Sequence, residues 1–161
     1  MRRRALELGA LGAKLISPKE VYTAEWVRLK CQFGCGSYGS CLTCPPYSPA
    51  PEETRRLLDS YEVAILIHSR EWPRIKDIVV QLEHEAFYAG YYKAFALGAG
   101  PCHLCEECAF EKGCRHPDLA RPSMEACGID VFKTAREAGF PIEVVPPEGG
   151  VENYFALLLL E

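Results

Sequence analysis

Two continuous apolar runs, separated by one long amphipathic stretch, dominate the hydropathy pattern of the chain. Residues 63–68 and 154–160 are apolar at nearly every position and have the length of a strand. Such runs are typical of strands buried on both faces. Residues 73–91 place apolar side chains on one helical stripe and charged side chains, Lys76 and Glu83 among them, largely elsewhere. We therefore expect a long helix packed against a buried sheet.

Shorter patterns complete the expected layers. We predict strands at 14–16, 93–98 and 142–145, and helices at 5–12, 24–29, 52–60 and 124–138. Trp26 and Leu29 are expected to face the core, and a break is expected near Gly128. Helices that alternate with strands predict an α/β or α+β fold, in which helices pack on a mixed sheet. We expect one layered domain over residues 1–161, with two cysteine-rich loops inserted at the ends of elements.

The composition argues against a protein that binds nucleic acid or a membrane. The chain has 161 residues and a formal net charge of −4, so it exerts no general electrostatic pull on nucleic acid or an anionic membrane. Its one basic run, Arg2-Arg3-Arg4, is short and typical of a solubilising tail. No apolar run has the length that a membrane span requires.

The nine cysteines are the unusual feature of the composition. A secreted disulfide scaffold is the first explanation to consider. Against it stand the odd count, the length of the chain and a start that does not resemble a signal peptide, since Glu7 and Lys14 interrupt the first apolar run. We expect instead a cytoplasmic protein whose thiolates bind metal.

Eight of the cysteines form two quartets. The second quartet follows the turn at 98–101 and has spacings of three, three and six: Cys102, Cys105, Cys108 and Cys114. A Cys-x-x-Cys-x-x-Cys run aims three sulfurs at one centre, as in bacterial ferredoxin loops, whereas zinc ribbons usually draw on two separated pairs. The first quartet has spacings of four, six and three, and its intervening glycines permit a tight loop: Cys31, Cys35, Cys41 and Cys44.

Two quartets match the ligand number of two 4Fe–4S clusters. We predict that the chain binds two such clusters and transfers electrons to a redox partner protein in anaerobic metabolism. The same residues suit two zinc sites in a structural adaptor module, one zinc and one cluster, or an iron–sulfur enzyme with an open iron site. The partition also stays open, because the last cysteine of one ferredoxin run ligates the other cluster, and Cys44 and Cys114 are candidates for such an exchange.

Residues beside the quartets have two interpretations each. His103 and His116 are alternative ligands or ordinary loop residues. The cations Lys112, Arg115 and Arg121 either raise the potential of a nearby cluster or form a solvated basic loop. The ninth cysteine, Cys127, lies near a predicted helix start and is either a reactive thiol or a buried core residue. No catalytic residue is identified.

Two blocks of sequence resemble one family. The first runs from Cys31 through Tyr38-Gly39 and Cys44-Pro45-Pro46 to residues 85–95, and the second from 98 through Cys114-Arg115-His116-Pro117 to residues 121–131. Over residues 30–161 the chain resembles predicted metal-binding proteins from anaerobic bacteria and archaea. The resemblance implies a cysteine-bound metal centre of the iron–sulfur type and specifies no reaction.

Overall fold

A four-stranded sheet forms the centre of the molecule. The computed structural model describes residues 1–161, and its strands are β1 (Gly12–Ile16), β2 (Val63–Ser69), β3 (Phe95–Leu97) and β4 (Tyr154–Leu160). They lie in the order β1-β2-β4-β3, and every neighbouring pair is antiparallel. The predicted layered fold is thus confirmed as α+β, but the sheet is antiparallel throughout where we expected a mixed one.

The two long central strands, β2 and β4, pair along their whole length. Along β2 and β4, Ile65 pairs with Leu158 and Leu66 with Leu157, so neighbouring pairs point to opposite faces. Both faces are covered, which is why these strands are apolar at successive positions. A slip by one residue would exchange the two faces of either strand.

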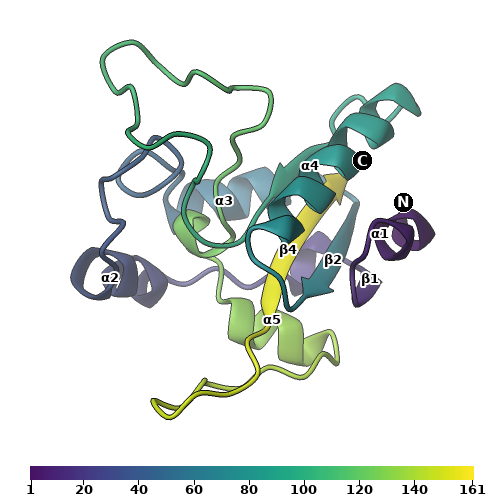
Figure 1. Cartoon of the computed structure of the whole chain (residues 1–161). Helices are drawn as coiled ribbons and strands as arrows, with labels where there is room; N and C mark the ends of the chain where they lie inside the picture. The colour runs from purple at the N-terminus through teal and green to yellow at the C-terminus, as the bar shows by residue number, and fades with distance from the viewer.

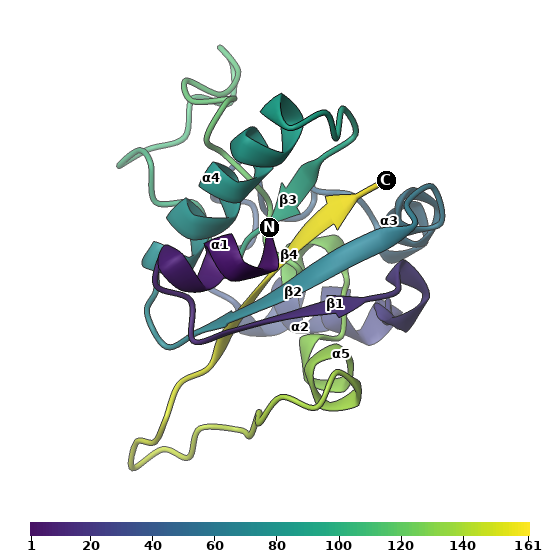
Figure 2. The same ribbon diagram turned by 90° about the vertical axis from the view of Figure 1, so that its right-hand side faces the viewer.

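Helices cover both faces of the sheet (Figure 2). On one face, α1 (Arg2–Glu7) and α4 (Arg74–Tyr88) bury side chains such as Ala5, Ile75 and Leu82 against the sheet. On the other face lie α3 (Pro51–Leu58), the 3-10 turn η2 (Glu125–Cys127) and α5 (Val131–Glu137). A short 3-10 turn η1 (Pro18–Glu20) leads into α2 (Glu25–Gly34), which extends away from the sheet (Figure 1).

Gly128 forms the break that we expected within the helix predicted over 124–138. Its φ is 74°, a left-handed conformation that ends η2 before α5 begins. A Cβ at this position would lie 2.4 Å from Cγ of Pro51, the first residue of α3. The glycine therefore permits both the break and the close contact between η2 and α3.

Three predictions are wrong. Residues 142–145 form no strand, although Ile142 is buried against the core. Trp26 and Leu29 are 48% and 57% exposed, because the buried side of α2 is the one that carries Val27. Lys76 and Glu83 of α4 are buried, although their charges placed them on the expected solvent face.

Seven of the nine cysteines lie on two long connections of the fold, whereas Cys31 lies in α2 and Cys127 in η2. One connection joins α2 to α3 and the other joins β3 to η2, and Figure 1 shows the two loops side by side at one end of the molecule. A hydrogen bond of 3.3 Å from the backbone N–H of Leu42 to Sγ of Cys108 joins them directly. None of the helices combines the length and apolar character needed to cross a bilayer.

Candidate metal centre

The first cysteine loop is anchored to the protein by Arg28 of α2. Its guanidinium donates hydrogen bonds to the carbonyl of Ser48 at 3.0 Å and to the carbonyl of Ala126 at 2.8 Å. The hydroxyl of Ser48 also donates to the Ala126 carbonyl, at 2.6 Å. The loop that carries Cys35, Cys41 and Cys44 is therefore fixed at its far end to η2, while α2 fixes its beginning.

The second cysteine loop is closed at its base by backbone pairing. The N–H of Gly98 donates to the carbonyl of Pro122, and the N–H of Met124 donates to the carbonyl of Gly98, at 2.8 and 3.0 Å. These bonds hold the two ends of the loop together, and the four cysteines lie between them. The second cysteine loop therefore begins and ends at the same place in the fold, where its two ends are hydrogen-bonded to each other.

A buried ion pair reinforces that base. Arg121 makes two hydrogen bonds to the carboxylate of Glu83, and both side chains are about 90% buried. Glu83 also accepts a hydrogen bond of 2.6 Å from the N–H of Ala96 in β3. The sequence suggested Arg121 as a cation beside the metal site. Its guanidinium pairs instead with Glu83 and thereby joins the second cysteine loop to α4 and β3.

Five cysteines line one cavity, which we call the cysteine cavity. Its volume is about 140 Å³, and it lies between the two loops. The second quartet supplies all four of its members and the first quartet supplies one: Cys102, Cys105, Cys108, Cys114 and Cys41. Cys41 is thus the member of the first quartet that lies beside the second, and the expected exchange of Cys44 and Cys114 between the two centres stays a prediction.

Cys41 lies where the two quartets meet. Its Sγ is 3.3 Å from Oγ1 of Thr43, and the Cys102 backbone also hydrogen-bonds to it. Burial raises the pKa of the Cys41 thiol, but these hydrogen bonds favour the thiolate, and the resulting pKa lies below the ordinary value. An anionic sulfur is thus stabilised at the junction of the loops.

The other three cysteines of the first quartet do not line the cysteine cavity. Burial raises the pKa of Cys44 to about 12, and its neighbours Cys41 and Cys35 add to that rise. Burial and the proximity of Cys35 likewise raise the pKa of Cys31. The raised pKa values favour the protonated form of Cys31 and Cys44, so metal binding at these two thiols must displace protons.

The donor chemistry of the eight cysteines fits a thiolate-bound metal centre. All are free thiols, and no disulfide connects them. No three His, Cys, Asp or Glu side chains converge closely enough to hold a single metal ion. The second quartet lines a cavity, and its thiolates are suitable ligands for zinc as well as for an iron–sulfur cluster.

Lys76 is the residue of this region that sequence reasoning missed. Its side chain is only 6% exposed, and its ammonium donates hydrogen bonds to the carbonyls of Pro101 at 2.7 Å and Gly100 at 3.5 Å. Burial lowers its pKa, and the nearby sulfurs of Cys102, Cys41 and Cys44 oppose that shift. One buried cation thus faces thiols of both quartets.

The pattern that indicates a buried Lys76 is a second stripe of residues on the helix predicted over 73–91. Lys76, Val80 and Glu83 recur at spacings of four and three, which places them on one face of α4 beside the apolar stripe. Val80 is the apolar member of that face. An apolar residue between two charges at helical spacing was the available indication that Lys76 and Glu83 are buried.

Two buried polar atoms near the cysteines have no hydrogen-bond partner. They are Nδ1 of His103 and Oε2 of Glu125. Burial raises the pKa of the Glu125 carboxyl, and the nearby Lys76 opposes the rise. The His103 ring lies edge-on to Trp72, with ring centroids 5.7 Å apart.

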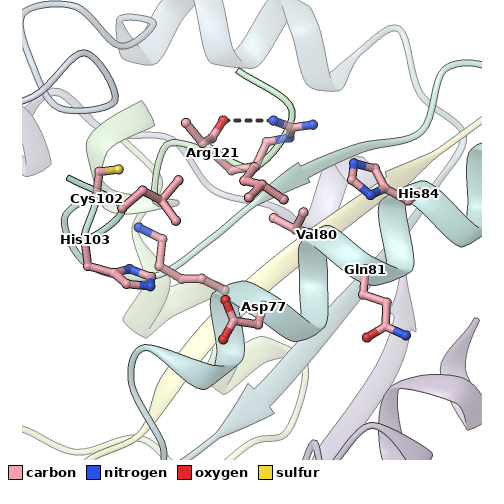
Figure 3. A pocket seen from close by; sticks show the side chains of 11 residues that line it. Asp77, Val80, Gln81, His84, Cys102, His103 and Arg121 are labelled. Carbon is pink, nitrogen blue, oxygen red and sulfur yellow. Dashed lines mark hydrogen bonds between the residues drawn. The ribbon is translucent and has the colours of Figure 1, made fainter. Parts of the chain in front are cut away.

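A second cavity adjoins the cysteine cavity, and we call it the α4 pocket. Its volume is about 220 Å³, and it shares Cys102, Leu104 and Ala120 with the cysteine cavity. Figure 3 shows Asp77, Gln81 and His84 projecting from α4 along one side, with His103 near Asp77 and Arg121 on the opposite wall. The pocket therefore lies between α4 and the second cysteine loop.

The remaining candidates lie outside the buried centre. Cys127 is 1% exposed in the core, and burial raises its pKa to about 12, which favours a core residue over a reactive thiol. Lys112 and Arg115 are exposed loop residues, and His116 is half-buried at the wall of the cysteine cavity. His103 lines the α4 pocket and not the cysteine cavity.

The fold and site together define an α+β domain with a cysteine-rich centre between two loops. The model of the family described as predicted metal-binding protein (DUF2284) matches residues 14–160, and the chain belongs to this family. No curated protein and no solved structure matches the chain. The family match supports metal binding and leaves the kind of metal to the site chemistry.

Proposed function

We propose that this protein is a cytoplasmic electron carrier that holds two 4Fe–4S clusters and exchanges electrons with a redox partner protein in anaerobic metabolism. The observation that carries the proposal is the cysteine cavity, where five thiols from two separate loops surround one space. A cubane cluster takes four thiolates at its corners, and when bound it supplies a reversible one-electron couple. The residues that would hold the clusters are the two quartets.

The protein side of the site supports this chemistry in two ways. The Leu42 N–H donates to Cys108 Sγ at 3.3 Å, and the His116 N–H donates to Cys114 Sγ at 3.4 Å. Hydrogen bonds to cluster sulfurs stabilise the reduced, more negative state. Lys76 places a positive charge beside thiols of both quartets, which acts in the same direction.

We assign Cys41 to the boundary between the two centres. It lines the cysteine cavity with the second quartet, and Cys44 of its own quartet lies near it. Centres that share a boundary of this kind are suited to exchanging electrons within one chain. We therefore expect electrons to pass between the two clusters within this domain.

Zinc is the competing metal, because Cys₄ sites also suit it. Structural zinc would make the chain an adaptor module without redox activity. The experiment that separates the two is reconstitution without oxygen, followed by absorption spectroscopy during stepwise reduction. We expect a coloured protein that bleaches reversibly on reduction. A colourless protein that binds zinc and unfolds on chelation would contradict the proposal.

A further inference from the structure

Four aromatic side chains are exposed together where α4 ends, and we call them the aromatic patch. Each is between 40% and 88% exposed, and they lie within one short segment: Phe87, Tyr88, Tyr91 and Tyr92. The rings of Phe87 and Tyr88 meet edge to face, with centroids 5.8 Å apart. Exposed aromatic residues in such a concentration mark an interaction surface.

The backbone holds the aromatic patch in a defined shape. Gly90, with a φ of 105°, ends α4, and the Tyr91 N–H then donates to the carbonyl of Ala86 at 3.1 Å. The hydroxyl of Tyr61 donates to the carbonyl of Lys93 at 2.8 Å and anchors the far side of the turn. Because the backbone is already fixed, binding at the patch costs little ordering of the chain.

The area of the aromatic patch matches what a dimer requires. At roughly 150–250 Å² for a whole aromatic side chain, the exposed fractions correspond to about 400–600 Å² of surface. A dimer interface of standard size buries about 800 Å² on each subunit, of which about 65%, or about 500 Å², is apolar. The patch alone therefore supplies the apolar part of one such interface.

Its position separates the aromatic patch from the metal site. None of its four residues lines the cysteine cavity or the α4 pocket. Lys76, which bonds to Pro101, precedes Tyr88 on the same helix by about 18 Å of helix length. A redox partner has to approach the cysteine loops, and Figure 1 shows the last turn of α4 pointing away from them. The patch is therefore suited to a different occupant.

The charges around the aromatic patch do not favour a partner of one sign. The ammonium of Lys93 lies 5.8 Å from the ring centroid of Tyr92. Glu85, one helical turn before Tyr88, is paired with Arg4 at 2.9 Å. A rim that carries both signs does not repel an identical copy, and it gives little attraction to a strongly charged partner.

We propose that two copies of this chain form a two-fold dimer through the aromatic patch. In a two-fold interface the same patch faces itself, and the edge of one aromatic ring packs against the face of another. The metal centres of both copies then lie outside the interface and stay open to a redox partner. The proposal goes beyond electron transfer and does not depend on the identity of the metal.

The test is sedimentation velocity of the full chain, with its metal as isolated, over a series of concentrations. The highest is about 100 μM, above the micromolar dissociation constants of the weaker interfaces of this size. We expect a reversible equilibrium that reaches twice the mass of the chain. Tyr88→Glu should raise the dissociation constant about tenfold or more, because it places an unpaired carboxylate in the interface and removes an aromatic contact.

Two further variants complete the experiment. Tyr92→Glu changes a second exposed residue of the patch and should also weaken the dimer. Phe33→Glu makes the matched change at an exposed ring of α2, outside the patch, and should leave the dissociation constant unchanged. A protein that stays monomeric at every concentration would overturn the proposal. Dissociation constants equal to wild type in both patch variants, or loss of the dimer in Phe33→Glu alone, would overturn it as well.

Discussion

The ammonium of Lys76 donates a 2.7 Å hydrogen bond to the carbonyl of Pro101, the residue directly before Cys102. A helix on one face of the sheet thereby fixes the start of the second cysteine quartet. The same charge lies near Cys41 and Cys44 of the first quartet. Lys76 therefore connects the scaffold with both quartets, and the first prediction depends on it.

Replacing Lys76 by Met is expected to lower the reduction potential of the bound clusters. Loss of a nearby positive charge destabilises the reduced state, which carries one more electron, and a shift of roughly tens of millivolts is expected. Lys76→Arg keeps the charge and should shift the potential less. A redox titration followed by electron paramagnetic resonance measures both variants, and equal potentials in wild type and Lys76→Met would contradict the prediction.

Removing one partner of the Glu83–Arg121 pair is expected to destabilise the protein strongly, whereas replacing both partners by apolar residues is expected to destabilise it less. Arg121→Met leaves the Glu83 carboxylate buried without its partner and should lower the free energy of unfolding by about 3–5 kcal/mol. The double variant Glu83→Leu with Arg121→Met should recover part of this loss, because no charge is left unpaired. Urea unfolding of the three proteins gives the comparison. A double variant less stable than Arg121→Met by the full cost of a second independent change would exclude this coupling.

Glu125 is expected to make stability depend on pH. Its pKa is raised in the folded state above the ordinary 4.5, so the folded protein holds a proton that the unfolded chain has released. Its contribution is fully present below the unfolded pKa and is lost as the pH rises through the folded pKa. Unfolding measured from pH 4 upward should show this decline in wild type and a smaller decline in Glu125→Gln.

Cys127 is expected to be inert and unnecessary for the metal centre. With a pKa of about 12, roughly one thiol in 10⁴ is ionised at pH 8. Cys127→Ala should keep the metal content of wild type, whereas Cys105→Ala should lose metal from the second quartet. Mass spectrometry after alkylation of the folded, metal-free protein should find Cys127 labelled last, and early labelling would show that the core is open.

The sequence predicted best where neighbouring residues determine the structure. Continuous apolar runs located β2 and β4, and local cysteine spacing identified a quartet that lines one cavity. Tertiary contacts decided the rest. Cys41 lies with the second quartet because two loops distant in sequence pack together, which no spacing within either loop reveals.

The misassigned residues have the same physical origin. Lys76 and Glu83 carry charge, and their burial is made tolerable by partners such as the carbonyl of Pro101 and the guanidinium of Arg121. Trp26 and Leu29 are apolar, but α2 extends from the sheet and leaves them exposed. Charge and apolarity predict burial only on average, and specific partners override them.

The most direct measurement of the central claim is a count of iron, sulfide and zinc in protein isolated without oxygen, made on wild type and on one variant of each quartet. The proposal predicts about eight irons with matching sulfide in wild type. It predicts about four in Cys31→Ala with Cys35→Ala, and about four in Cys105→Ala with Cys108→Ala. Stoichiometric zinc without sulfide, or loss of all iron from only one of the two variants, would contradict it.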